Sequence, residues 1–132
     1  MMMSKDKAMC AETGMFLIRL GLGLVFVAHG WGKIGMMDGT VSFFGTLGLA
    51  PFFAYLVSWV EFLAGLAMIL GVCTKWAGIL LALVMAGAIW YVKGAMGFLG
   101  GYELDLTLLL VALGVAFTGP GSFTVHKLFG GK

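Results

Sequence analysis

Charged residues are scarce in this sequence. Asp, Glu, Lys and Arg together make up only 11% of the 132 residues, and the net charge of +2 comes from scattered side chains. Nucleic-acid-binding proteins instead carry clustered basic residues on one face or along a helix. Nucleic-acid binding is therefore excluded as a function.

Cysteine and proline are also rare, with two of each. Cys10 and Cys73 lack the C-x-x-C spacing and the neighbouring histidines of a metal or dithiol site. The sequence contains no haem-ligand pair, iron–sulfur pattern or nucleotide-binding loop. We therefore expect no metal site in this chain and no redox metal of its own.

Hydrophobic residues are abundant instead, at 61% of the chain with a mean hydropathy of +1.07. Soluble domains contain about 45–50% apolar residues, so this composition indicates a membrane protein. A helix crosses a bilayer with about 20 apolar residues, and about 17 suffice. Four stretches meet this length: residues 13–32, 52–72, 76–92 and 102–118. The sequence thus predicts an all-α, integral membrane four-helix bundle.

The segment "MMDGTVSFFGTLGLAP" (36–51) separates the first two predicted spans. It is too polar and glycine-rich to cross a membrane, yet it contains several large apolar side chains. We expect an interfacial loop or half-helix here, between helices 1 and 2 of the bundle.

The lysines predict the orientation in the cell membrane. Two lysines, Lys33 and Lys93, lie at one end of the predicted bundle. A larger group lies at the other end: Lys5, Lys7, Lys75, Lys127 and Lys132. Because basic residues favour the cytoplasmic side, both termini are predicted to be cytoplasmic. The expected organisation is an N-terminal tail (1–12), a transmembrane domain (13–125) and a C-terminal tail (126–132).

Two charged residues lie deep within predicted spans. Glu61 is near the middle of the second span, where a charge is expensive, so it should face the bundle interior with Ser58 and Gly65 on the same side. Arg19 lies only about 9 Å inside the first span, within reach of the headgroups as a snorkelling or phosphate-anchoring side chain. Two hypotheses stay open for Glu61: a structural clamp with Arg19, or a carboxylate that handles a proton or ligand.

Four further polar residues are predicted near the outer boundary. His29 and Lys33 lie four residues apart on one helix face, and Glu103 and Asp105 begin the fourth span. They either converge on one polar site or make separate local hydrogen bonds.

Several motifs resemble, in order and spacing, the DoxX family of small bacterial and archaeal membrane proteins. They are "RLGLGLVFVAHGWGKI", "FFGTLGLAP", "VEFLAGLAMILGVCTKWAGILLALVMAGAIW" and "GGYELDLTLLLVALGVAFTGPG". The resemblance implies a four-helix membrane protein with recurring polar positions at Arg19, His29, Lys33 and Glu61. Related DoxD-type members are linked to thiosulfate:quinone oxidoreductase or terminal quinol oxidase complexes.

The leading hypothesis is a membrane subunit or accessory of a quinone-linked redox complex, with a protein partner and quinone as the candidate cofactor. Glu61 and His29 are the candidate catalytic residues; the candidate binding residues are Arg19, Lys33, Glu103 and Asp105. The alternatives are a small proton-coupled transporter that uses Glu61, or a non-catalytic membrane scaffold. Whether the chain forms a homo-oligomer stays open.

Overall fold

The computed structural model describes residues 4–130, which contain helices and turns but no strand. The α-helices are α1 (Ser4–Gly35), α2 (Met37–Thr46), α3 (Pro51–Leu70), α4 (Thr74–Ala88), α5 (Glu103–Thr118) and α6 (Val125–Leu128). Three short irregular helices join α4 to α5: η1 (Ile89–Lys93), η2 (Gly94–Met96) and η3 (Phe98–Tyr102). The predicted all-α class is confirmed.

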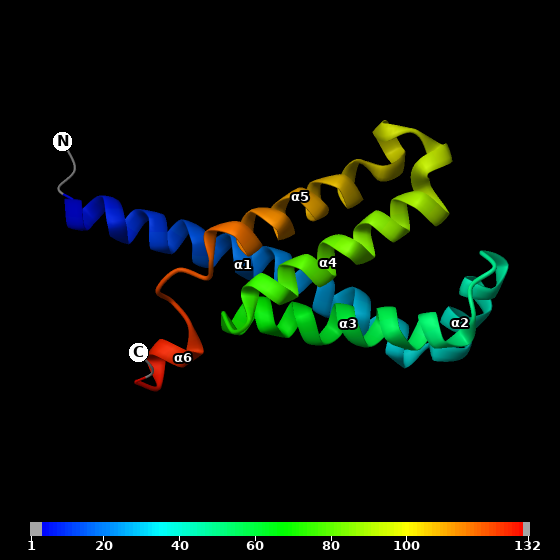
Figure 1. Cartoon of the computed structure of the whole chain (residues 1–132), viewed down its shortest axis with the longest axis horizontal. Coiled ribbons are helices and arrows are strands. Elements are labelled where there is room, and N and C mark those ends of the chain that lie inside the picture. The colour runs from blue at the N-terminus through cyan, green and yellow to red at the C-terminus, as the bar shows by residue number, and fades with distance from the viewer. Residues whose placement is uncertain (1–3, 131–132) are drawn as a thin grey trace.

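Four helical segments are long and apolar enough to span a membrane: Ser4–Gly35, Pro51–Leu70, Thr74–Met96 and Phe98–Thr118. The chain runs away from its N-terminus in α1, back in α3, away again in α4 and back in α5, so both ends of the described chain lie at the same end of the bundle (Figure 1). Residues 4–12, expected in a tail, continue α1 as helix. The four-span bundle is confirmed.

Glycines bring α1 and α3 into close contact. A Cβ atom at Gly30 would lie 2.5 Å from the backbone nitrogen of Phe62, and one at Gly23 would lie 2.7 Å from the carbonyl oxygen of Gly65. A Cβ atom at Gly65 would in turn lie 2.9 Å from the backbone nitrogen of Val27. Small residues allow such backbone approach in membrane helices, so these glycines set how α1 and α3 pack.

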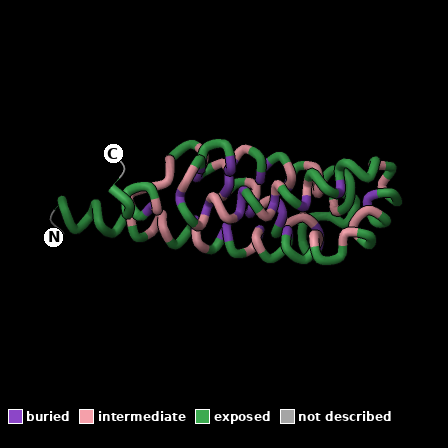
Figure 2. Tube along the Cα trace, turned by 90° about the horizontal axis from the view of Figure 1, so that it is seen from below, coloured by how far each residue is buried: buried purple, intermediate pink, exposed green. Residues whose placement is uncertain are grey.

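A second close contact joins α4 and α5. A Cβ atom at Gly78 would lie 2.5 Å from the carbonyl oxygen of Ala112 and 3.0 Å from the Cβ atom of Ala116. The buried core includes side chains from α1, α3, α4 and α5, among them Leu22, Phe26, Met68, Leu81, Leu108 and Val115. Figure 2 shows the buried positions along the middle of the bundle, with exposed chain around them.

The segment predicted as an interfacial loop or half-helix contains a short helix, α2. Its ten residues would extend only about 15 Å, too short to cross a bilayer, and it lies at the end of the bundle opposite the termini (Figure 1). The Thr40 hydroxyl bonds to the carbonyl oxygen of Lys33 at 3.1 Å, which ties α2 to the end of α1. Pro51 then occupies the first turn of α3, where its missing N–H group is harmless.

Candidate functional site

A partly buried ion pair joins α1 to the middle of α3. The Nζ atom of Lys33 lies 2.6 Å from the Oε2 atom of Glu61, whose side chain is only 2% exposed. Ser58, one turn before Glu61, is fully buried and donates its hydroxyl to the carbonyl oxygen of Ala54 at 2.6 Å. The structure thus places Glu61 in the bundle interior, where Lys33 is its ion-pair partner.

The register of the two helices explains why Lys33 is that partner. Gly30 lies against Phe62 and Gly23 against Gly65 and Ile69, so Glu61 is close to the level of the end of α1. A helical Cβ atom points toward the helix N-terminus, and the Lys33 side chain is therefore directed back toward Glu61. At about 1.5 Å per residue, the same register puts Arg19 roughly 18 Å away along the axis. A clamp between Arg19 and Glu61 is therefore absent.

Arg19 does not snorkel to the headgroups. Its side chain is completely buried, and its Nη2 atom donates to the carbonyl oxygen of Phe123. Its guanidinium carbon lies 5.8 Å from the centroid of the Phe16 ring. The guanidinium also lies beside Gly71, the left-handed C-cap of α3, where a Cβ atom would overlap Nη1. Arg19 therefore joins α1, the end of α3 and the C-terminal segment.

The contacts between α1 and the C-terminal segment were not predicted from the sequence. Glu12, two turns before Arg19, accepts a hydrogen bond from the backbone N–H of Ser122. Between these two residues, Phe16 packs edge-to-face on Phe123 with ring centroids 6.1 Å apart. The available signal was the spacing of Glu12, Phe16 and Arg19 on one helix face, together with the final "GPG" that turns the chain back.

The four polar residues predicted near the outer boundary, His29, Lys33, Glu103 and Asp105, do not form one connected cluster. Asp105 is 5% exposed and pairs with Lys93, with Nζ and Oδ2 3.3 Å apart. Within residues 4–130, no hydrogen bond or ion pair connects His29 or Lys33 to Glu103 or Asp105. The structure therefore shows two separate lysine–carboxylate pairs, one on α1 and α3 and one on η1 and α5.

His29 is exposed, although it continues the face of α1 that is buried farther down. Leu22 and Phe26 on this face belong to the core, and His29 and Lys33 follow at helical spacing. Toward this end of the bundle, the α4–α5 pair diverges from the α1–α3 pair (Figure 1), which leaves the imidazole uncovered. His29 thus presents an accessible imidazole one turn from the Lys33–Glu61 pair.

Comparisons with known proteins agree with this architecture. The sequence model of the DoxX family matches residues 14–94. A Bacillus subtilis protein named "Putative oxidoreductase CatD" is 40% identical over 108 residues, which cover 82% of this chain and 81% of that protein. "Inner membrane protein YqjF" of Escherichia coli is 28% identical over 126 residues, 92% of this chain and 95% of that protein.

A third relative is "Uncharacterized membrane protein Rv3486" of Mycobacterium tuberculosis. It is 32% identical over 126 residues, which cover 83% of this chain and 77% of that protein. No solved structure matches the chain. The family match covers more than half of the sequence and the relatives cover most of it. This chain is a multi-pass membrane protein of the DoxX family.

Proposed function

We propose that this protein is a membrane subunit of a quinone-linked redox complex and that Lys33, Glu61 and His29 form its proton-handling site. The observation that carries the proposal is the Lys33–Glu61 pair between two membrane-spanning helices, in which the Glu61 side chain is buried. Ionisable residues at such positions are energetically unfavourable, and they typically mark proton or substrate pathways. The name of the Bacillus subtilis relative supports a redox role.

The residues present fit the head of a quinone. An ammonium group has three N–H donors, and Lys33 uses one of them on Glu61 while its side chain stays 30% exposed. Its other donors, and the exposed ring of His29, are available to the two carbonyl oxygens of a quinone that arrives from the lipid. The quinone would supply the two-electron chemistry, with the electrons coming from the partner subunit.

The role of this chain is then to orient the ligand and to move protons. Lys33 compensates the charge of Glu61 in the interior, and Glu61 in turn fixes the direction of the Lys33 side chain. His29 is exposed one turn from Lys33, and an imidazole can both donate and accept a proton, so it is the candidate for exchanging protons with the membrane surface. A proton would pass between His29 and the bound ligand beside Lys33.

The proton-coupled transporter is less well supported by this geometry. An exchanging carboxylate must be protonated and released during each cycle, whereas Glu61 is already neutralised by Lys33 at 2.6 Å. The carboxylate is therefore already engaged by a residue of the same chain and is less suited to exchange with a cationic substrate.

Quinone binding is testable with the purified protein in lipid nanodiscs. Trp31 and Trp59 both contact Phe62, the neighbour of Glu61, so quinone bound at this site should quench tryptophan fluorescence. We expect Lys33→Met to weaken the quenching titration about ten-fold, as the loss of one charge-assisted hydrogen bond implies. Lys93→Met is the matched control because it breaks the other lysine–carboxylate pair. Absence of saturable quenching by quinone, or equal weakening in both variants, would refute the proposal.

A further inference from the structure

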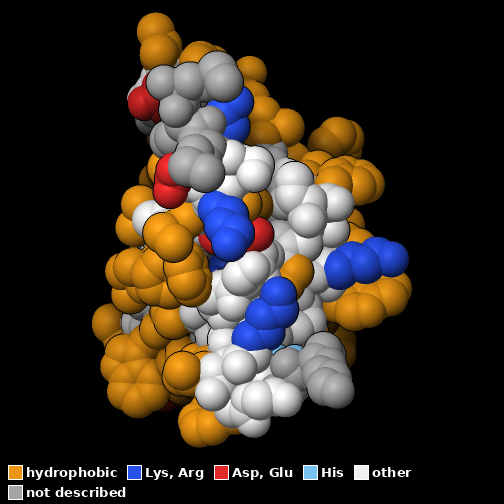
Figure 3. Space-filling model, turned by 90° about the vertical axis from the view of Figure 1, so that its left-hand side faces the viewer, with side chains coloured by type: hydrophobic (Ala, Val, Ile, Leu, Met, Phe, Trp, Pro, Cys, Tyr) orange, Lys and Arg blue, Asp and Glu red, His pale blue; other side chains and the backbone are white. Residues whose placement is uncertain are grey.

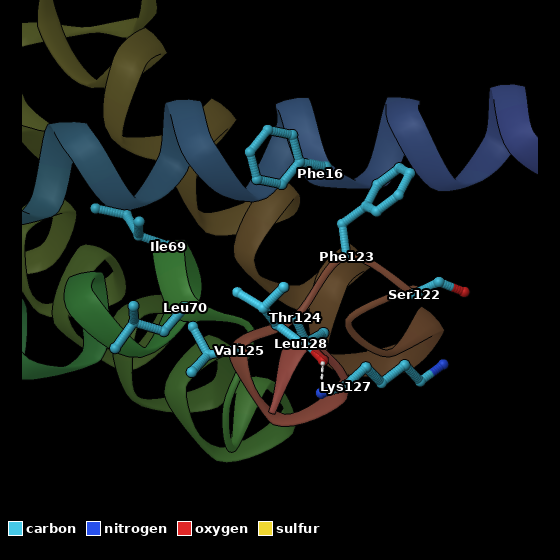
Figure 4. Close-up of a pocket in the computed structure, with 9 residues that line it drawn as sticks. All are labelled: Phe16, Ile69, Leu70, Ser122, Phe123, Thr124, Val125, Lys127 and Leu128. Carbon is cyan, nitrogen blue, oxygen red and sulfur yellow. Dashed lines mark hydrogen bonds between the residues drawn. The ribbon is translucent and has the colours of Figure 1, made fainter. Parts of the chain in front are cut away.

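A groove opens at the end of the bundle that carries the termini. It has a volume of about 430 Å³ and lies between α1, the last turn of α3 and the C-terminal segment. Its apolar walls come from Phe16, Ile69, Leu70, Val125 and Leu128. Figure 4 shows these side chains around the groove, with Lys127 and Ser122 at one side of it and their polar ends pointing away from Ile69 and Leu70. The groove is thus apolar along most of its length and polar at one side.

Basic side chains outnumber acidic ones around this groove, although the Glu12 carboxylate lies behind Ser122 and accepts its backbone N–H. Lys127 lines it directly, and several Lys or Arg side chains are spread over this end of the molecule (Figure 3). Behind its wall lies the guanidinium of Arg19, which contacts the lining residues Phe16 and Phe123. The Nε and Nη1 atoms of Arg19 are buried and have no hydrogen-bond partner within residues 4–130, and no carboxylate there pairs with Arg19. A buried cation of this kind favours a nearby anion.

We propose that this groove binds one anionic phospholipid from the leaflet at the terminal end of the bundle. One acyl chain would lie against Phe16, Ile69 and Leu70, which belong to membrane-spanning helices. The phosphate would lie at the polar side, beside Lys127 and Ser122. Arg19 needs no direct contact with the phosphate, because a charge in a poorly polarisable interior acts over several ångströms.

A phospholipid fits better than a soluble ligand for two reasons. The groove faces outward at the end of the membrane-spanning segments, where lipid is the surrounding solvent. It also combines a long apolar wall with a basic rim, and basic pockets between membrane helices are typical sites for anionic headgroups. A free phosphate ion would use the rim and leave the apolar wall exposed.

The test uses the full chain in nanodiscs with equal amounts of phosphatidylglycerol and phosphatidylcholine. Native mass spectrometry then counts the lipids that remain bound after release into the gas phase. We expect phosphatidylglycerol to be retained over phosphatidylcholine about five-fold, the preference that one interfacial lysine contributes. Lys127→Gln should remove most of this preference, and Val125→Trp should reduce retention of both lipids by filling the groove.

Lys75→Gln is the control, because it removes an exposed lysine from the same end but outside the groove. It should retain the preference of the unaltered protein. Equal retention of the two lipids by the unaltered protein would overturn the proposal. So would an equal loss in Lys75→Gln and Lys127→Gln, full retention in Val125→Trp, or displacement of the lipid by millimolar inorganic phosphate.

Discussion

Lys33 and Glu61 lie 28 residues apart in the sequence and 2.6 Å apart in the structure. The pair joins the end of α1 to the centre of α3 and places a carboxylate in the bundle interior. Since a lone charge there would be strongly unfavourable, Lys33 compensates the charge of the buried Glu61 side chain.

Removing one partner should therefore destabilise the bundle more than removing both. Lys33→Met leaves Glu61 buried without a counter-ion and should cost about 3 kcal/mol of unfolding free energy. The double variant Lys33→Met/Glu61→Leu replaces the pair with apolar side chains and should recover most of that loss. Thermal unfolding in detergent, followed by size-exclusion chromatography, measures the difference. Additive effects of Lys33→Met and Glu61→Leu would show that the pair contributes nothing to stability.

Packing at the α1–α3 contact gives a second prediction. Gly30→Ala should destabilise the protein by about 1–3 kcal/mol, because the new methyl group meets the backbone of Phe62 and the two helices must separate. Gly32→Ala is the control on the same helix, since a Cβ atom there meets nothing within 4 Å. The same thermal assay compares the two variants. Similar unfolding temperatures for both would contradict the proposed contact.

The fold could be predicted from the sequence because the spans are local properties of the chain. The length and hydropathy of each apolar run defined four helices, and the glycine-rich stretch between the first two indicated an interfacial loop or half-helix, which the structure shows as α2. The first residue of α1 was harder to predict from the sequence. Residues 4–12 are polar enough to leave the membrane but remain compatible with helix, so hydropathy alone did not reveal that α1 begins at Ser4.

The site was only partly predictable. The depth of Glu61 in its span correctly indicated burial, because burial follows from position within one helix. Its partner depended on the register of α1 against α3, which is set by contacts between distant glycines and not by either helix alone. Arg19 shows the same limit more strongly, because its acceptor, the carbonyl group of Phe123, lies 104 residues away.

Membrane orientation is a third prediction. Cys10 and Cys73 are both exposed and belong to the end of the bundle that carries the termini. Both should react with a membrane-impermeant maleimide from the cytoplasmic side, in inverted vesicles but not in intact cells. An Ala95→Cys variant without the two native cysteines should show the reverse pattern, because Ala95 is exposed at the opposite end. Labelling of Cys10 in intact cells would place the termini outside.

Gly71 gives the fourth prediction, because both its backbone conformation and its surroundings require a residue without a side chain. It ends α3 with a φ of 76°, a left-handed conformation that disfavours other residues, and it leaves room for the guanidinium of Arg19. Gly71→Ala should therefore displace Arg19 from the carbonyl group of Phe123 and loosen the C-terminal segment. We expect a loss of at least about 2 kcal/mol, from backbone strain and the unpaired buried cation together.

Two measurements separate this effect from a general loss of stability. Gly87→Ala is the control, because a Cβ atom at that helical position meets nothing within 4 Å and should be neutral or slightly stabilising. Hydrogen exchange should be faster in residues 122–130 of Gly71→Ala than in the control, while α4 and α5 keep their protection. If exchange rises equally throughout the bundle, Arg19 is not what holds the C-terminal segment. Glu12 would still bind Ser122 in this variant. Exchange should therefore rise more in the residues from Phe123 onward, which lose the contact with Arg19, than at Ser122.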